Sequence, residues 1–175
     1  MTKTPSILLL AALFTPSLAL AATLELPTET RLQVQVIDSL FLNENESRLD
    51  DILIRPAASA QGSHELPSHC VMVGDALIDG ERVRITTKSV TCIATQGSES
   101  EIYSGDISAA AYDADGSFGI AACEGSRCEI TPEQIFELRL ASDLVIEEQE
   151  NTSEQINIQR RQLDDDEAAA PSPSE

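Results

Sequence analysis

Alternation of apolar and polar residues is the feature of this sequence that most restricts its fold. It is clearest in Arg31-Leu32-Gln33-Val34-Gln35-Val36 and returns at residues 82–86 and 136–140. A period of two places one side of each strand in a core and the other in water. The chain contains no tryptophan, two tyrosines and four phenylalanines, so Val, Ile, Leu and Ala must supply the core. We therefore predict an all-β fold, an antiparallel β-barrel or sandwich of short strands.

Turn signals divide the chain into further strand-like runs. Asp79-Gly80 and Asp115-Gly116 each lie between two such runs, a pattern typical of β-hairpins. We expect additional strands at residues 70–78, 90–95, 101–104, 107–112 and 118–123. Helical periodicity is weak, and the two candidates are residues 45–53 and a helix start at Thr131-Pro132-Glu133-Gln134. Residues 55–68 contain Pro56, Gly62 and Pro67 and are predicted to form a loop.

The first 21 residues have the pattern of a cleavable export signal. Lys3 supplies the positive start, residues 7–20 the apolar stretch, and Ala19-Leu20-Ala21 the small-x-small cleavage pattern. The mature chain should begin near Ala22, without a lipid-bearing cysteine there. The alternative is a retained membrane anchor, which Pro16 and the shortness of the apolar stretch disfavour. We expect a periplasmic or secreted protein without membrane insertion.

The remaining chain divides into one domain and a tail. Residues 22–146 have the length and patterning of a single β-barrel domain. Residues 147–175 are acidic, end in an Ala-Pro-Ser-Pro run and lack the apolar surface needed to offset ordering. We predict a disordered acidic tail, with a short extra strand at residues 155–159 as the alternative.

The charge of the chain restricts its partners. The formal net charge is −19 at pH 7, from 30 acidic and 11 basic residues. Such a field repels phosphate backbones and anionic lipid headgroups. Nucleic acid is therefore not an expected partner, whereas a basic protein segment is compatible with the charge.

Four cysteines in a small exported chain indicate two disulfides, although four cysteines allow three connectivities. Cys123 and Cys128 flank Glu-Gly-Ser-Arg, a turn-rich quartet that can bring them within bridging range. Cys70 would then pair with Cys92. If the Asp79-Gly80 turn set the register strictly, position 70 would face position 89, so this bridge needs a bulge or a longer loop.

No residue pattern indicates catalysis, a cofactor or a metal. His64 and His69 lie in the predicted loop beside a single cysteine, and Cys70 has no suitably placed histidine base. Asp113-Ala114-Asp115-Gly116 is similar to the start of a calcium loop, but a hairpin turn explains it better. The adjacent pairs Asp50-Asp51 and Glu147-Glu148 are not convergent carboxylates. We therefore expect no catalytic, cofactor-binding or metal-binding residues.

Residues 66–120 resemble the β-barrel domain of the TraB/TrbI-type scaffold proteins of bacterial conjugation and type IV secretion. The resemblance extends to Leu26-Pro27 and residues 136–144, and its central motifs are Cys70, Gly74-Asp75, Glu81-Arg82-Val83, Ser89-Val90-Thr91-Cys92, Gly105, Asp115-Gly116 and Gly119-Ile120. It implies a barrel fold and a scaffold role. The family also has an inner-membrane helix, and a helical hairpin that crosses the outer membrane. Here a cleavable signal and the Cys123–Cys128 loop stand in their places, so we expect a barrel that docks without coupling two membranes.

Three functions remain open from the sequence. The first is a periplasmic accessory or scaffold component of a conjugative type IV secretion apparatus, which binds other apparatus proteins. The second is an independent periplasmic or secreted ligand-binding or inhibitor domain without a role in transfer, because one fold hosts many functions. The third is an envelope enzyme that uses scattered carboxylates, which lacks a recognisable acid and base pair.

Export and cleavage can be tested directly. Expression of the full chain in a bacterial host should release a periplasmic form whose N-terminus is Ala22 or a close neighbour. Intact-mass measurement and N-terminal sequencing of the released form check this. A mature form that keeps Lys3 would contradict the predicted signal.

Overall fold

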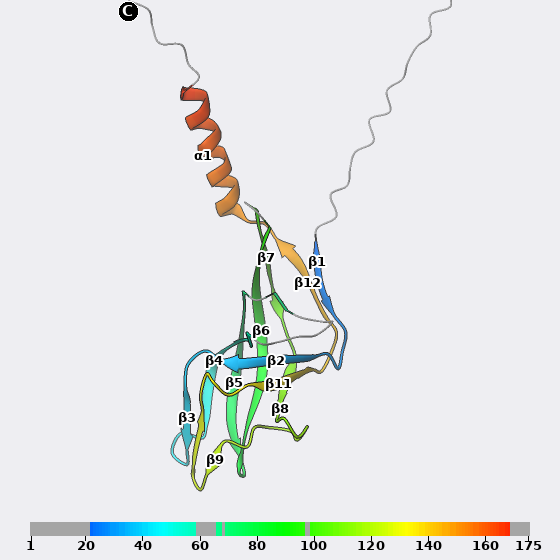
Figure 1. Cartoon of the computed structure of the whole chain (residues 1–175), viewed down its shortest axis with the longest axis vertical. Helices are drawn as coiled ribbons and strands as arrows, with labels where there is room; N and C mark the ends of the chain where they lie inside the picture. The colour runs from blue at the N-terminus through cyan, green and yellow to red at the C-terminus, as the bar shows by residue number, and fades with distance from the viewer. Residues whose placement is uncertain (1–21, 59–65, 68, 97–98, 169–175) are drawn as a thin grey trace, which may run out of the picture.

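The chain folds into a barrel of antiparallel strands (Figure 1). Along these strands, residues alternate between a buried and an exposed face. The computed structural model describes residues 22–58, 66–67, 69–96 and 99–168. The predicted signal and most of the predicted loop at residues 55–68 lie outside these residues. The described residues form the following elements: β1 (Thr23–Leu26), β2 (Arg31–Val36), β3 (Leu40–Asn43), β4 (Arg48–Pro56), β5 (Cys70–Asp79), β6 (Arg82–Gln96), β7 (Glu99–Asp106), β8 (Ala109–Tyr112), β9 (Cys123–Glu124), β10 (Arg127–Ile130), β11 (Phe136–Leu140), β12 (Leu144–Gln149) and α1 (Thr152–Ala168).

Six antiparallel strands close into a barrel. Their order is β6-β5-β4-β2-β11-β8, and β8 returns to β6 through the pairing of Ala110 with Thr86. The Thr87 side chain reinforces this short contact. Its hydroxyl group accepts a hydrogen bond from the Ala109 amide at 2.8 Å and donates one through its O–H to the Ile107 carbonyl at 3.1 Å. The predicted antiparallel β-barrel is therefore confirmed.

Two smaller groups of strands extend from the barrel. The second half of β6 leaves the ring and pairs with β7, and β7, β12 and β1 continue the sheet outward. Strands β3, β10 and β9 form a separate sheet. Figure 1 shows this small sheet at one end of the barrel, and the β7-β12-β1 extension with helix α1 at the other.

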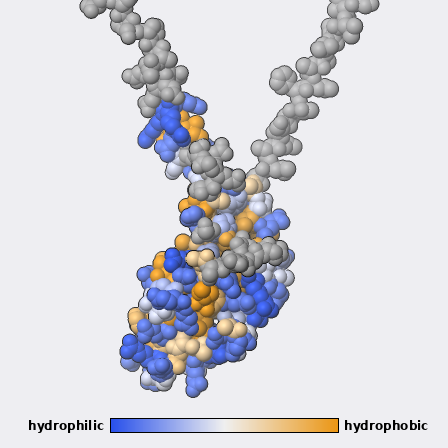
Figure 2. Space-filling model, viewed as in Figure 1, coloured by the Kyte–Doolittle hydropathy of each residue, from blue (hydrophilic) through white to orange (hydrophobic). Residues whose placement is uncertain are grey.

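The core consists of the apolar halves of the alternating strands. In β2, Leu32, Val34 and Val36 are buried while their neighbours face outward, and β11 repeats the pattern with Phe136, Leu138 and Leu140. Each such side chain stabilises the fold by about 1.5–3 kcal/mol when removed from water. Figure 2 shows the surface of one face of the molecule. Hydrophilic residues dominate its flanks, and some hydrophobic residues gather near the middle.

A bulge in β4 explains why the helix expected at residues 45–53 is wrong. Leu49 pairs with Ala76 and Ile52 with Gly74, so two residues of β4 stand opposite Asp75 alone. Asp51 adopts a left-handed φ of 57° to accommodate the extra residue. The bulge lengthens the spacing between apolar residues from two to three, which imitates helical periodicity.

A second bulge, in β6, brings Cys70 opposite Cys92. The hairpin turn lies at Gly80-Glu81, with Asp79 paired to Arg82 and Gly80 at a φ of 64°. Strict pairing from this turn would place Cys70 opposite position 91. The register shifts by one residue at Lys88, and Cys70 pairs with Cys92. The disulfide therefore uses a bulge, and the predicted strands at residues 82–86 and 90–95 are halves of one strand.

Both disulfides are present. The Sγ atoms of Cys70 and Cys92 are 2.00 Å apart, and those of Cys123 and Cys128 are 2.02 Å apart. The first pair is buried between β5 and β6, and the second joins the two strands of the β9–β10 hairpin. Two disulfides fit an oxidising compartment outside the cytoplasm.

Two local predictions differ from the structure. Residues 118–123 do not form a continuous strand, because Gly119 adopts a φ of 81° and the segment makes isolated bridges before β9 begins. Thr131-Pro132-Glu133-Gln134 forms a turn instead of a helix start, with the Gln134 amide donating to the Thr131 carbonyl at 3.0 Å. The next residues enter β11 immediately, which leaves no length for a helix.

The end of the chain also differs from the prediction. Strand β12 runs to Gln149, beyond the boundary expected at residue 146, because Glu148 and Gln149 pair with β7. The strand considered at residues 155–159 is wrong, since this segment belongs to helix α1. The described side chains of α1 are exposed, so its many good helix formers and not packing favour the helix. No helix among the described residues combines the length and apolar character needed to cross a membrane.

The two disulfides should contribute unequally to stability. The Cys70–Cys92 bond spans 22 residues and the Cys123–Cys128 bond 5. Loop closure in the unfolded chain predicts losses of about 3 and about 2 kcal/mol, respectively, when each pair is replaced by alanine. Urea unfolding of Cys70→Ala/Cys92→Ala and Cys123→Ala/Cys128→Ala measures both losses. A larger loss for the second pair would contradict the proposed order.

Candidate binding groove

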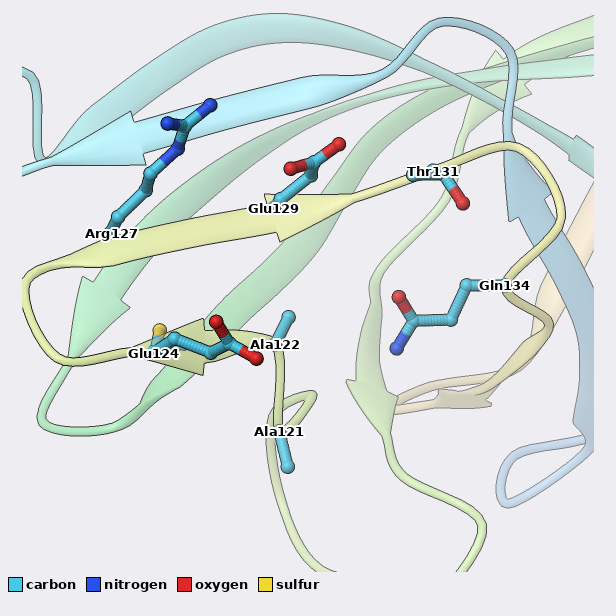
Figure 3. A pocket seen from close by; sticks show the side chains of 8 residues that line it. Ala121, Ala122, Glu124, Arg127, Glu129, Thr131 and Gln134 are labelled. Carbon is cyan, nitrogen blue, oxygen red and sulfur yellow. The ribbon is translucent and has the colours of Figure 1, made fainter.

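A groove of about 730 Å³ lies beside the small sheet at one end of the barrel (Figure 3). Strands β9 and β10 and the segments that flank them form its walls. Figure 3 shows Arg127 and Glu129 projecting from one side of β10, and Gln134 pointing into the space between β10 and Ala121-Ala122. The groove is lined by Ala121, Ala122, Cys123, Glu124, Arg127, Glu129, Thr131 and Gln134.

Pairing across the small sheet adds an exposed aromatic ring to this region. Phe41 in β3 pairs with Glu129 in β10, so the two side chains lie on the same face. The Phe41 side chain is 46% exposed, and the Arg127 guanidinium carbon lies 5.8 Å from its ring centre. Arg127 also pairs with Glu124 across the β9–β10 hairpin. An exposed ring and an arginine beside a concave surface are the residue types that dominate protein–protein interfaces.

Most polar side chains of the groove form no hydrogen bond or ion pair with other described residues. Among the described residues, the side chains of Glu124, Glu129 and Gln134 form no hydrogen bond or ion pair, and Arg127 contacts Phe41 without a carboxylate partner. Thr131 differs, because its hydrogen bond to Glu133 lowers the pKa of that carboxyl. Two carboxylates, one guanidinium and one amide therefore remain able to contact a ligand.

Other charged clusters serve the fold. The Arg82 guanidinium donates to the Gly119 carbonyl at 2.6 Å and lies 3.5 Å from the Asp113 carboxylate. Asp113 also accepts from the Ala121 amide at 3.0 Å, and the Ser117 amide lowers the pKa of Asp115. The calcium-like segment at residues 113–116 thus has its oxygens bonded to an arginine and to backbone amides, as a hairpin turn requires.

The largest ion cluster joins the two bulges. Asp75 on β5 accepts from the Lys88 ammonium at 2.6 Å, from the Arg48 guanidinium at 2.9 Å and from the Asp51 amide at 3.2 Å. Its side chain is largely buried, at 14% exposure. The bond from Lys88 is the main cause that holds the pKa of Asp75 below its usual value. The cluster holds both bulged segments against the central strand.

The four cysteines predicted from the sequence have a structural role, and the histidines considered beside them form no site within the described residues. Cys70, Cys92, Cys123 and Cys128 are all in disulfides, so Cys70 is not a free nucleophile. His64 lies outside the described residues, and His69 immediately precedes the Cys70 strand. Within the described part of the chain, no three His, Cys, Asp or Glu residues are grouped so that they could hold a metal ion.

The groove itself was not predicted from the sequence. Its residues come from Ala121-Ala122, β9, β10 and the turn before β11, and the neighbouring Phe41 comes from a strand much earlier in the chain. The alternation in Arg127-Cys128-Glu129-Ile130 could have indicated that Arg127 and Glu129 share an exposed face. The concavity depends on packing that no local pattern reports.

Comparisons with known proteins do not assign the groove a function. No protein-family model, no curated protein and no solved structure matches this chain.

The Asp75 cluster predicts a specific pH dependence. Because the folded-state pKa of Asp75 lies below the ordinary value of 3.8, its contribution to stability is present above about pH 4 and is lost as pH falls from there through the lower folded-state pKa. Asp75→Asn should be less stable than the unsubstituted chain at pH 7, with the difference shrinking towards pH 2. Urea unfolding across this range tests it, with exposed Asp38→Asn as the control. An equal deficit at pH 7 and pH 2 would contradict the ion-pair origin.

Proposed function

We propose that this protein is a periplasmic protein-binding accessory or scaffold component of a conjugative type IV secretion apparatus, and that it acts by binding and not by catalysis. The observation that carries the binding role is the groove with its free side chains beside exposed Phe41 and Arg127. The disulfides support a location in an oxidising compartment. The resemblance of residues 66–120 to the TraB/TrbI-type barrel supports the conjugative context.

Arg127 and Phe41 are the proposed anchors of the interface. Burial of an exposed ring releases water from apolar surface, and the guanidinium can bind a partner carboxylate or carbonyl in a defined geometry. Glu124 and Glu129 flank the arginine and favour a partner that carries both charge signs. Residues of this kind cost more than about 1 kcal/mol when truncated at an interface, which corresponds to at least about fivefold weaker binding.

A second candidate function is an independent ligand-binding or inhibitor domain without a role in transfer. The groove volume of about 730 Å³ favours it, because small-molecule sites span roughly 300–1,000 Å³. The polar lining would suit a small polar ligand. A gene neighbourhood without transfer genes, together with ligand binding to the purified chain, would support this function over the first.

Co-purification from a cell that carries a conjugative element tests the first proposal. A tagged chain at native expression level should recover components of the transfer apparatus from solubilised envelopes, and Phe41→Ala/Arg127→Ala should recover at least about fivefold less. The matched control is Phe118→Ala, which removes a ring of similar exposure, 39%, outside the groove. Recovery of no apparatus component, or equal recovery by the groove variant, would contradict the proposal.

A further inference from the structure

The open edge of β1 is a second surface with unused bonding capacity, at the end of the barrel opposite the groove (Figure 1). β1 pairs with β12 on one side, and within the described part of the chain no strand lies on its other side. An unpaired strand edge presents a row of backbone donors and acceptors to solvent. Natural proteins use such edges to bind an extended segment of another chain.

The register identifies which backbone groups are open. The Glu148 amide donates to the Ala22 carbonyl at 2.9 Å, which makes Ala22 and Glu148 a hydrogen-bonded pair. Because such pairs alternate along antiparallel strands, Leu24 and Leu26 also bond to β12, whereas Thr23 and Glu25 direct their N–H and C=O groups to the open edge. A partner strand would meet two donors and two acceptors there.

The side chains of the strands around this edge carry negative and no positive charge. Strands β1, β7 and β12 contain six acidic residues and no lysine or arginine. The barrel strands differ, since they hold seven of the eleven basic residues of the chain: Arg31, Arg48, Arg55, Arg82, Arg84, Lys88 and Arg139. Each ion pair observed among the described residues contains one of these seven.

Among the described side chains of the extension, no carboxylate forms an ion pair with a lysine or arginine. Glu25 and Glu147 are exposed and lie on the same face as the paired residues Thr23 and Val145, while Leu24 and Leu26 face Ile146 and Leu144 on the other. Within the extension, a hydrogen bond to Glu101, burial and the nearby charge of Glu148 raise the pKa of Tyr103 to about 12. A segment that pairs with β1 would place its side chains alternately on the face that carries Glu25 and on the apolar face that carries Leu24 and Leu26.

We propose that the open edge of β1 binds an extended, positively charged segment of a partner protein, which adds a strand to the β7-β12-β1 sheet. Alternation of basic and apolar residues in that segment would match the acidic outer face and the apolar inner face of β1. A second copy of this chain is a poorer occupant, because it would bring a further charge of −19 to an edge whose strands carry acidic and no basic side chains. This inference is independent of the groove, since the two surfaces share no residue.

The direct probe is a labelled peptide of alternating lysine and valine, with the glutamate–valine peptide as its counterpart. We expect the lysine peptide to bind the purified, exported chain, with affinity that falls as salt rises. Hydrogen exchange at the Thr23 and Glu25 amides should slow on binding, whereas the Leu24 amide, already bonded to β12, should change little. Equal binding of the two peptides, or slowed exchange confined to other strands, would overturn the proposal.

Two matched variants separate backbone bonding from other effects. Thr23→Pro removes the open N–H without breaking a β1–β12 hydrogen bond, and proline is tolerated at such edge positions. Thr23→Val removes the same hydroxyl and keeps the N–H. We expect binding to weaken about fivefold or more in Thr23→Pro, and to stay within about twofold in Thr23→Val. Equal affinities of the two variants would overturn the proposal.

Charge and self-association complete the test. Glu25→Gln/Glu147→Gln should weaken lysine-peptide binding about fivefold at low salt and flatten its salt dependence, and it remains informative even if the proline variant does not fold. Sedimentation of the unsubstituted chain should show a monomer. A dimer that Thr23→Pro converts to a monomer would assign the edge to a second copy and overturn the basic-partner proposal.

Discussion

The ladder between β5 and β6 is the interaction on which the rest of the structure depends. β6 contributes its first half to the closed barrel and its second half to the extension, and β5 pairs with it along both. The bulge at Lys88 separates the two halves. Because Lys88 bonds to Asp75 on β5, the extra residue is held at one position, and the direction in which β6 leaves the barrel is held with it. Loss of this register would misplace the disulfide as well as the extension.

Strands that keep a strict period of two could be predicted from the sequence, and bulged or short ones could not. Residues 31–36 and 136–140 were predicted with the bounds that β2 and β11 have. In β4 the extra residue at Asp51 changes the apolar spacing and imitates a helix. The groove was missed for another reason: β3 and β10 are far apart in the sequence, and only their pairing places Phe41 beside Glu129. Register between distant strands is a tertiary property.

Charge segregation links the fold to the proposed binding surfaces. In the barrel, six of the seven basic residues form ion pairs with carboxylates among the described residues, and the central pair, Lys88 and Asp75, stabilises a bulge. In the extension, the described acidic side chains form no ion pair with a lysine or arginine. Like charges held together in one sheet repel one another, and this repulsion is relieved when a cationic segment binds. The apolar face of the extension thus stabilises it, while the acidic side chains on its outer face are not neutralised by basic ones.

The two surfaces differ in how they can recognise a partner. The groove presents side chains on a short sheet whose hairpin is closed by the Cys123–Cys128 bond, so its recognition depends on the shape and chemistry of the side chains that fill it. The β1 edge presents backbone groups, which accept any sequence that can extend, and its selectivity comes from charge and alternation. A domain with one side-chain site and one backbone site at opposite ends can join two different proteins. That arrangement requires a rigid body between the sites, and the closed barrel with β6 running from one part to the other supplies it.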